Sequence, residues 1–263
     1  RSAFPPPRSH SRPRPRIVLF GDSLTELGFG QAGSVPGTEG MGWASLLACR
    51  YSRRADVLVR GYSGYTTRHA LGVLPSVLAD VSPGVGAGQG PPPLLYAVFL
   101  GANDAAHPGM RQHVPVAEYG TNLGKIVDAI RRHHHHLPRR NCAIVLITPP
   151  PVDDGAWAAW CARNGRDRSV RTSASAREYG RRCSALAEEL GVPVLDAWVA
   201  LGGEDGPAGG GGGFAQHLTD GLHLSPSGNA ALCDALMGLI EESLPELVRE
   251  RVPLEHEPWT ELC

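Results

Sequence analysis

The stretch Arg16–Thr25, RIVLFGDSLT, constrains the fold of this chain more than any other segment. It contains four consecutive apolar residues, a run of the right length for a strand that is buried on both faces. The run ends at Gly21. Asp22, Ser23 and Thr25 then mark a turn and the start of a helix. A strand that passes a serine to the first turn of a helix puts the hydroxyl at the carboxyl edge of a sheet, where α/β folds form their crevices.

Ser23 is therefore the first candidate nucleophile. The start of a helix offers free N–H groups and a partial positive charge, and both would stabilise a developing oxyanion. A Gly-Asp-Ser sequence after a strand is also ordinary turn and N-cap chemistry that implies no catalysis. Motifs elsewhere in the chain are needed to distinguish the catalytic interpretation from the structural one.

The composition restricts the class of protein. With 263 residues, the chain can form one α/β domain or two small ones around a large core. Its hydrophobic fraction of 42% and charged fraction of 19% are typical of a globular protein, and a net charge of −1 argues against a nucleic-acid partner. No apolar run approaches the ~20 residues that cross a bilayer, so no membrane span is predicted.

The cysteines and the first fifteen residues bear on the cellular compartment. The six cysteines show no CxxC pair or regular spacing, which favours buried thiols and a cytoplasmic location. Residues 1–15 form a basic, Pro-rich leader without acidic residues, and its composition favours disorder. The remnant of an organelle-targeting peptide is the alternative for this leader.

Short apolar runs alternate with amphipathic stretches along the chain. The expected strands are 17–20, 56–60, 96–100, 142–148 and 192–196, and the expected helices are 43–51, 68–80, 117–132, 173–190 and 226–243. This alternation predicts a single three-layer α/β/α domain over residues 16–243, with a five-stranded parallel sheet. Residues 152–171 are expected to be irregular, and residues 244–263 to form a surface tail.

Two further polar loops follow expected strands. Gly64 lies after the second strand, where a small residue lets a backbone N–H approach a ligand, although a plain turn glycine is an equal alternative. Asn103 follows the third strand, and its amide can donate a hydrogen bond. Because parallel strands share one carboxyl edge, Ser23, Gly64 and Asn103 are expected at the same edge of the sheet.

Asp220 and His223 supply the remaining candidate groups. They lie three residues apart in HLTDGLHLSPSG, and across a turn this spacing lets a carboxylate orient an imidazole. Trp157 and Trp160 are expected beside the crevice, where they would line an apolar pocket or simply pack.

Three other features carry less weight. Gly28-x-Gly30-x-x-Gly33 matches a dinucleotide fingerprint in form, but seven residues separate it from the end of the strand, so loop glycines are the better interpretation. His133–His136 could suggest a metal site, but four consecutive residues cannot all face one ion, and a solvated helix end is favoured. The Gly-rich segment 202–213 is expected to be a flexible loop. The residues thus call for no metal and no cofactor.

The motifs GDSL (21–24), RGYSGYTTR (60–68), GAND (101–104) and DGLHLS (220–225) together resemble the SGNH-hydrolase (GDSL esterase/lipase) superfamily. The match in order and loop position covers about residues 16–243. The finer features GYSGYTTR, FLGANDAA followed by QHVPVAEY, ITPPPVDD and DGLHLSPSGN are similar to the isoamyl acetate-hydrolysing esterase branch. Val59 and His69 stand where relatives commonly carry Asn and Trp, which bears on pocket shape and substrate preference.

The resemblance implies an SGNH-hydrolase, flavodoxin-like fold and a serine esterase that needs no cofactor. Ser23 would be the nucleophile, His223 the general base and Asp220 the residue that orients the imidazole. Ser23, Gly64 and Asn103 would form the oxyanion hole.

The expected substrate is a small-molecule ester of short to medium acyl chain, and a homodimer is the open alternative for assembly. A carbohydrate-ester deacetylase, a lysophospholipase or a thioesterase would use the same residues. A binding protein on a hydrolase scaffold would be expected to lack one of them.

Overall fold

The computed structural model describes residues 14–30, 40–81, 93–135, 142–165, 171–203 and 213–256, together with residues 258 and 260. In chain order the elements are β1 (Arg16–Gly21), α1 (Ser23–Glu26), η1 (Leu27–Phe29), α2 (Trp43–Arg50), β2 (Asp56–Gly61), α3 (Thr67–Val81), β3 (Leu95–Phe99), α4 (Val116–His134), β4 (Ala143–Ile147), α5 (Asp154–Arg163), α6 (Ser173–Leu190), β5 (Val194–Leu195), α7 (Ala197–Ala200), η2 (Ala215–His217), α8 (Pro226–Ser243), η3 (Pro245–Leu247) and η4 (Arg249–Arg251).

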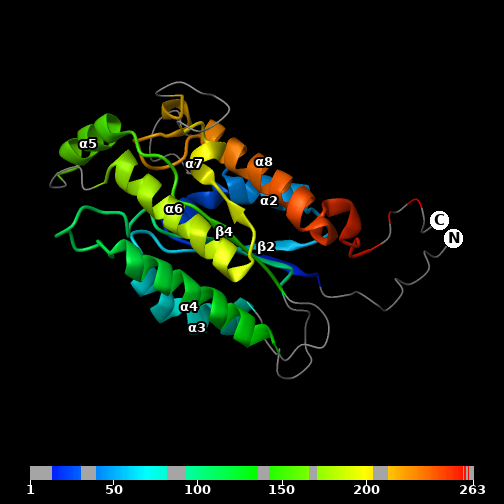
Figure 1. Cartoon of the computed structure of the whole chain (residues 1–263). Helices are drawn as coiled ribbons and strands as arrows, with labels where there is room; N and C mark the ends of the chain where they lie inside the picture. The colour runs from blue at the N-terminus through cyan, green and yellow to red at the C-terminus, as the bar shows by residue number, and fades with distance from the viewer. Residues whose placement is uncertain are drawn as a thin grey trace.

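The strands form one parallel sheet in the order β2-β1-β3-β4-β5. Helices cover both faces, with α2 and α8 on one side and α3 and α4 on the other (Figure 1). This is the predicted three-layer α/β/α fold. The chain first runs from β1 to β2 and then crosses back to β3 on the other side of β1, so the strand order reverses between β1 and β3. A crevice is expected outside the carboxyl ends of these two strands.

The first strand shows why its sequence is uninterruptedly apolar. Ile17 and Leu19 join the core under α2 and α8, whereas Val18 and Phe20 join the core under α3, α4 and α6. All four side chains are buried. A strand in the middle of a parallel sheet has no solvent face, and every position along it therefore gains from being apolar.

Two helices coincide with the predicted ranges, 173–190 and 226–243, because their ends carry strong local signals. Gly191 is the C-cap of α6 and adopts the left-handed conformation that favours glycine, with φ 59° and ψ 43°. Ser225 precedes Pro226 and accepts a hydrogen bond from the Gly228 N–H at 3.2 Å, which caps the start of α8.

The expectation of irregular structure over residues 152–171 was wrong in part, because residues 154–163 form α5. Asp153 caps this helix by accepting a hydrogen bond from the Ala156 N–H at 2.9 Å. Its apolar side chains, Trp157 and Cys161, are spaced four residues apart and both are buried. The last strand, β5, is shorter than predicted and has two residues.

The end of the chain also differs from the expected surface tail. Leu244, Leu247 and Val252 are buried and belong to the same core as α2 and α8. The Tyr51 hydroxyl donates a hydrogen bond to the Leu247 carbonyl at 2.6 Å. Two short 3₁₀ helices, η3 and η4, place these apolar residues against the core. The segment is polar on average, so its composition does not reveal their burial. Residues 1–13 of the expected leader lie outside the described residues.

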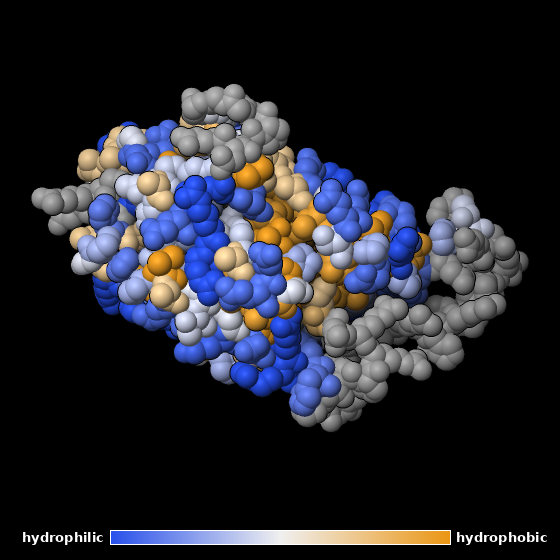
Figure 2. All heavy atoms as spheres, in the orientation of Figure 1, coloured by the Kyte–Doolittle hydropathy of each residue, from blue (hydrophilic) through white to orange (hydrophobic). Residues whose placement is uncertain are grey.

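The surface in Figure 2 is mixed, and apolar residues gather in the middle of this face, over β5 and the neighbouring parts of α7 and α8. Within the described part of the chain, no helix combines the length and the apolar character that crossing a bilayer requires.

Candidate active site

The candidate nucleophile lies at the junction between β1 and α1. Ser23 is half-buried and is the first residue of α1, and only Asp22 separates it from the end of β1. Asp22 caps the helix because its side chain accepts a hydrogen bond from the Leu24 N–H at 3.0 Å. The sequence prediction of a turn and a helix start after Gly21 is therefore confirmed.

His223 connects Ser23 to Asp220 in one line of hydrogen bonds. Its Nε2 lies 3.0 Å from the Ser23 Oγ, and its Nδ1 lies 2.7 Å from the Asp220 Oδ2. Ser23 and His223 are 200 positions apart in sequence, and the sheet edge brings them together. The three residues that the sequence singled out thus form a serine–histidine–aspartate arrangement.

The loop that carries Asp220 and His223 is held by short-range bonds. The second carboxylate oxygen of Asp220 accepts hydrogen bonds from the Leu222 N–H at 3.0 Å and the His223 N–H at 2.8 Å. The Thr219 N–H donates to the His223 carbonyl at 2.8 Å. A three-residue spacing therefore works here because the carboxylate caps the turn with one oxygen and reaches the imidazole with the other.

Burial would raise the pKa of Asp220, but hydrogen bonds and the charge of His223 outweigh burial and hold the pKa below its usual range. The carboxylate is therefore ionised at neutral pH and accepts the Nδ1 proton of His223. Assigned from this network, the tautomer leaves Nε2 free to accept a proton from Ser23.

Asn103 and Gly64, the other two candidates, also meet at this edge. The Asn103 amide nitrogen donates to the Tyr65 carbonyl at 3.0 Å and to the Asp22 carboxylate at 3.3 Å, next to Ser23. Gly64 has φ +79°, a conformation that favours glycine. The Gln112 side-chain nitrogen donates to the Gly64 carbonyl at 2.7 Å and to the Asn103 Oδ1 at 3.2 Å, so one side chain contacts both candidates.

Asp104 is a site residue that sequence reasoning missed. It is fully buried, and its carboxylate accepts a hydrogen bond from the Thr67 N–H at 3.0 Å, which caps α3 from the neighbouring loop. Burial raises its pKa to about 6. The bond fixes the loop with Gly64 against the loop with Asn103. Its position directly after Asn103, at a strand end, is the signal that could have identified it.

Arg171 and Gln112 were also missed. Arg171 is only 5% exposed, and it donates to the Ala102 carbonyl at 2.9 Å, to the Asn103 Oδ1 at 2.6 Å and to the Gln112 Oε1 at 2.8 Å. Arg171 belongs to the stretch that was expected to be irregular, and an isolated arginine in such a stretch gives no sign of burial.

Asp22 is the other unusual carboxyl group of the site. It is completely buried, and burial raises its pKa to about 7, while the hydrogen bond from the Leu24 N–H acts in the opposite direction. The negative charge of nearby Asp104 raises it further. The site therefore holds a carboxyl group that gains its proton near neutral pH, directly before the candidate nucleophile.

Trp157 forms a wall next to His223. Its ring meets the imidazole edge to face at 6.2 Å, and Trp160 stacks on it at 4.9 Å with the two planes 9° apart. The Arg171 guanidinium lies 5.6 Å from the centre of the Trp157 ring. Helix α5 therefore supports the imidazole through aromatic packing, a role that the sequence did not indicate for the two tryptophans.

The glycines of the dinucleotide-like motif serve packing. A Cβ atom on Gly28 would lie 3.1 Å from the Trp43 side chain, and one on Gly30, whose φ is +117°, would overlap the Gly40 carbonyl. Gly33 lies outside the described residues. The observed contacts favour the interpretation as loop glycines.

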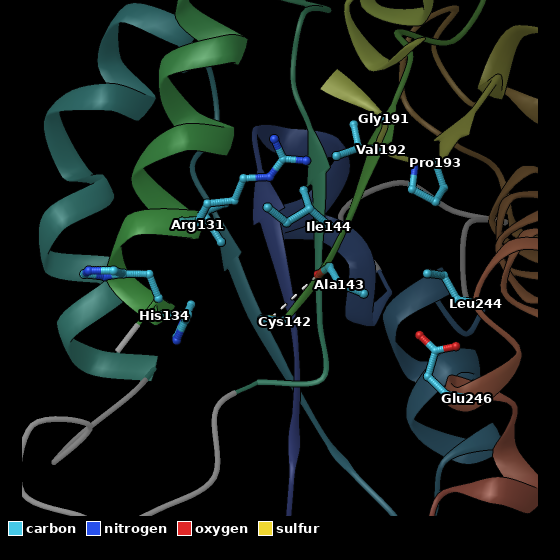
Figure 3. Close-up of a pocket in the computed structure, with 12 residues that line it drawn as sticks. Arg131, His134, Cys142, Ala143, Ile144, Gly191, Val192, Pro193, Leu244 and Glu246 are labelled. Atoms are coloured by element: carbon cyan, nitrogen blue, oxygen red, sulfur yellow. Dashed lines mark hydrogen bonds between the residues drawn. The ribbon is translucent and has the colours of Figure 1, made fainter. Parts of the chain in front are cut away.

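His133–His135 lie at the opposite edge of the sheet, beside a cavity of about 540 Å³ lined by the end of α4 and the start of β4 (Figure 3), and residue 136 lies outside the described residues. The prediction of a solvated helix end is wrong for His134, which is 5% exposed and contacts the Tyr96 hydroxyl through Nε2 at 3.0 Å. Burial lowers its pKa to about 4. Among the described residues, no group of three or more His, Cys, Asp or Glu side chains is placed to hold a metal ion.

Comparisons with known proteins identify the family and the fold. Residues 19–231 match the GDSL-like lipase/acylhydrolase family. A GDSL esterase/lipase of Arabidopsis thaliana is 37% identical over 237 residues, 88% of this chain and 87% of that protein. The isoamyl acetate-hydrolyzing esterase 1 homolog of Rattus norvegicus is 36% identical over 237 residues, 89% of this chain and 85% of that protein. The crystal structure of the lipase/acylhydrolase from Enterococcus faecalis superimposes with a TM-score of 0.62 at 23% identity, over 92% of this chain and 100% of that one, and is similar in fold.

Proposed function

The chain belongs to the GDSL-like lipase/acylhydrolase family, has the fold of the SGNH hydrolases and is a carboxylic ester hydrolase; from this premise we propose that it cleaves short to medium acyl esters through an acyl-Ser23 intermediate. The observation that carries the proposal is the continuous chain of hydrogen bonds from Ser23 through His223 to Asp220, with separations of 3.0 and 2.7 Å. Both lie within the reach that proton transfer requires.

The first half of the reaction acylates Ser23. The hydroxyl oxygen attacks the ester carbonyl carbon, and its proton moves to the His223 Nε2. Asp220 stabilises the imidazolium through Nδ1 and stays ionised, as its lowered pKa supports. When the tetrahedral intermediate collapses, the bond to the alkoxy oxygen breaks, and the alcohol leaves with the proton from His223.

The second half repeats these steps with water. The oxygen of a water molecule attacks the acyl carbon while His223 accepts a proton from that water. The bond between the acyl carbon and the Ser23 oxygen then breaks. Ser23 regains its proton from His223, and the acid is released. No metal or cofactor takes part in these steps.

The oxyanion would be held by the Ser23 and Gly64 N–H groups and by the Asn103 amide. Without substrate, the Asn103 amide nitrogen donates hydrogen bonds to the Tyr65 carbonyl at 3.0 Å and to the Asp22 carboxylate at 3.3 Å. The second bond is at the long end of the range for hydrogen bonds, so this hydrogen is the one that an oxyanion would attract.

Two exposed apolar side chains support a substrate with an apolar acyl or alcohol group. Phe29 and Met41 are both about half exposed, with values of 53% and 48%, and a hydrogen bond from the Gly42 N–H to the Phe29 carbonyl brings the two segments together. Phe29 follows Ser23 in the same segment of the chain. Exposed apolar side chains in the segment that carries the nucleophile favour a substrate with an apolar part. The rat relative is named for isoamyl acetate, an ester of this class.

Hydrolysis of a p-nitrophenyl ester series from acetate to palmitate tests the proposal. We expect wild-type turnover on the shorter chains and a loss of about 10⁴-fold or more in Ser23→Ala. The control is Ser184→Ala, which removes a half-buried hydroxyl from the middle of α6 and should keep full activity. A fluorophosphonate should transfer its phosphonyl group to the Ser23 oxygen with loss of fluoride, and the mass of this group should appear on the wild type only. Full activity in Ser23→Ala would rule out the mechanism.

The same assay separates the alternative substrates. Acetylated xylo-oligosaccharides, a lysophospholipid and an acyl thioester are measured beside the simple esters. Turnover of one of these with none on the simple esters would replace the proposed substrate class and keep the Ser23 mechanism.

A further inference from the structure

We propose that Arg171, acting with Gln112, is a positioning residue that fixes the direction of the Asn103 amide and links it to Gly64. The inference rests on the proposed function, because it assigns to these two side chains the arrangement of the oxyanion hole. Arg171 lies outside the quoted motifs, and Gln112 is the first residue of QHVPVAEY, where the sequence assigned it no role.

The guanidinium of Arg171 makes contacts on two neighbouring residues of the loop after β3. Its Nε donates to the Ala102 carbonyl at 2.9 Å and its Nη2 to the Asn103 Oδ1 at 2.6 Å. The planar fork therefore holds the backbone before Asn103 and the side chain of Asn103 at the same time. Arg171 is 5% exposed, so the loop is held by a buried and rigid group rather than by a mobile surface side chain.

These contacts decide which end of the Asn103 amide faces the catalytic serine. The oxygen and nitrogen of an amide are nearly equal in size, and packing alone would admit both orientations. Arginine has five N–H donors and no acceptor, so only the Asn103 oxygen can face it. The amide nitrogen must then point the other way, toward Tyr65 and Asp22 at the site.

Gln112 continues this fixed direction of hydrogen bonding from Arg171 to Gly64. Its Oε1 accepts from Arg171 at 2.8 Å, and this leaves its nitrogen to donate to the Gly64 carbonyl at 2.7 Å and to the Asn103 Oδ1 at 3.2 Å. The direction of every bond in this network follows from the one residue that can only donate. The loops after β2 and β3, which carry the two remote oxyanion donors, are thereby set relative to each other.

The charge of Arg171 adds to the effect of its position. A cation on the oxygen of an amide draws electron density from the nitrogen, and the N–H becomes a stronger donor toward an oxyanion. This gain is largest in the transition state, where the negative charge develops. The expected signature is therefore a loss in kcat with little change in KM.

A double-mutant cycle between Arg171→Met and Asn103→Ala tests the inference with p-nitrophenyl acetate. Asn103→Ala should lower kcat by about 10²–10³-fold, since it deletes an oxyanion donor. Arg171→Met should lower kcat by about 10–10²-fold in the wild-type background, because it misplaces that donor. In the Asn103→Ala background, the same change should lower kcat by no more than about threefold, because the group through which it acts is gone.

Arg163→Met is the matched control, because it removes an exposed arginine at the end of α5 and should leave kcat unchanged. Thermal unfolding of every variant checks that the fold is intact. If Arg171→Met does not fold, Gln112→Met replaces it in the cycle, since Gln112 is only half-buried and contacts the same amide. The cycle with Gln112→Met should show the same loss of effect in the Asn103→Ala background.

Two results would overturn the inference. One is an unchanged kcat in Arg171→Met, and the other is an equal loss in both backgrounds, which would place the action of Arg171 outside the Asn103 amide. Either result can arise while turnover still depends on Ser23. Turnover that survives in Ser23→Ala would instead contradict the proposed function, so the two failures are distinguishable.

Discussion

His223 and His134 lie at opposite edges of the same sheet, and their surroundings give them opposite properties. At the carboxyl edge, His223 has a carboxylate on one nitrogen at 2.7 Å and a hydroxyl on the other at 3.0 Å. At the amino edge, His134 meets the Tyr96 hydroxyl through one nitrogen, whereas its Nδ1 is buried without a hydrogen-bond partner. The two imidazoles differ in their partners, and the carboxylate beside His223 is what places this ring to act as a general base.

A buried carboxyl group at one edge and the buried imidazole at the other also differ, in the direction of their pKa shifts. Burial raises the pKa of Asp22 to about 7 at the carboxyl edge, and burial lowers the pKa of His134 to about 4 at the amino edge. In both groups, burial disfavours the charged form. The stability that Asp22 contributes should therefore fall as pH rises, whereas the stability that His134 contributes should fall as pH falls.

The largest expected effect comes from removing the carboxylate that distinguishes His223. Asp220→Asn should lower kcat by about 10⁴-fold, because an amide in place of the carboxylate favours the wrong imidazole tautomer and cannot stabilise its positive charge. The measurement is kcat on p-nitrophenyl acetate, with circular dichroism to verify the fold. A loss of less than tenfold would mean that His223 does not need its carboxylate partner.

Asp22→Asn tests the buried acid. The native state holds the Asp22 proton up to about pH 7 and the unfolded chain releases it near pH 4, so this group stabilises the fold at low pH and its contribution is lost as pH rises through about 7. Relative to the variant, the wild type should lose up to about 4 kcal/mol of unfolding free energy between pH 4 and pH 8.

Urea unfolding of both proteins across this pH range gives the difference in free energy directly. Asp234→Asn, which removes an exposed carboxylate on α8, controls for the loss of a negative charge. A difference between wild type and Asp22→Asn that stays constant from pH 4 to pH 8 would contradict the raised pKa.

His134→Gln tests the buried base with the opposite sign. The native state resists protonation of His134 down to about pH 4, and the unfolded chain takes up the proton near pH 6.5. The stability from this group is present above pH 6.5 and is lost as pH falls through about 4, by at most about 3 kcal/mol relative to the variant. Activity at neutral pH should not change.

Glutamine keeps a polar group for the Tyr96 hydroxyl, so His134→Gln isolates the titration from the loss of a buried hydrogen bond. His135→Gln is the control, because His135 is exposed at the same helix end. If wild type and His134→Gln lost stability in parallel under acid, the contrast between the two edges would fail at this residue.

The smallest effect is expected from paired glycine substitutions. Gly64 and Gly191 both have positive φ angles, +79° and +59°, so alanine at either position should cost about 1–2 kcal/mol of unfolding free energy. A Cβ on Gly64 would also lie 3.3 Å from the Gln112 amide, whereas nothing lies within 4 Å of one on Gly191. Only Gly64→Ala should therefore lower kcat, and equal kcat values for the two variants would contradict its place in the site.

The parts of this protein that depend on local chemistry were predictable from the amino-acid sequence. The apolar run in β1, the cap at Asp22, the C-cap at Gly191 and the turn that joins Asp220 to His223 all act over a few residues, and the printed chain carries their full signal. The order of the strands and helices followed from the same patterns, because alternating buried strands and amphipathic helices fit one layered fold.

The contacts between residues that are distant in sequence follow from the packing of the elements and were not predictable from the sequence. Arg171 reaches Asn103 across 68 positions of sequence, and His134 is buried against Tyr96 across 38. A charged residue in a loop and a histidine at a helix end are both predicted to be solvated. Sequence patterns indicate burial only where buried positions recur at regular spacing along a helix or strand. The burial of a single polar side chain depends on elements that come from elsewhere in the chain, and its hydrogen-bond partners exist only once those elements have packed.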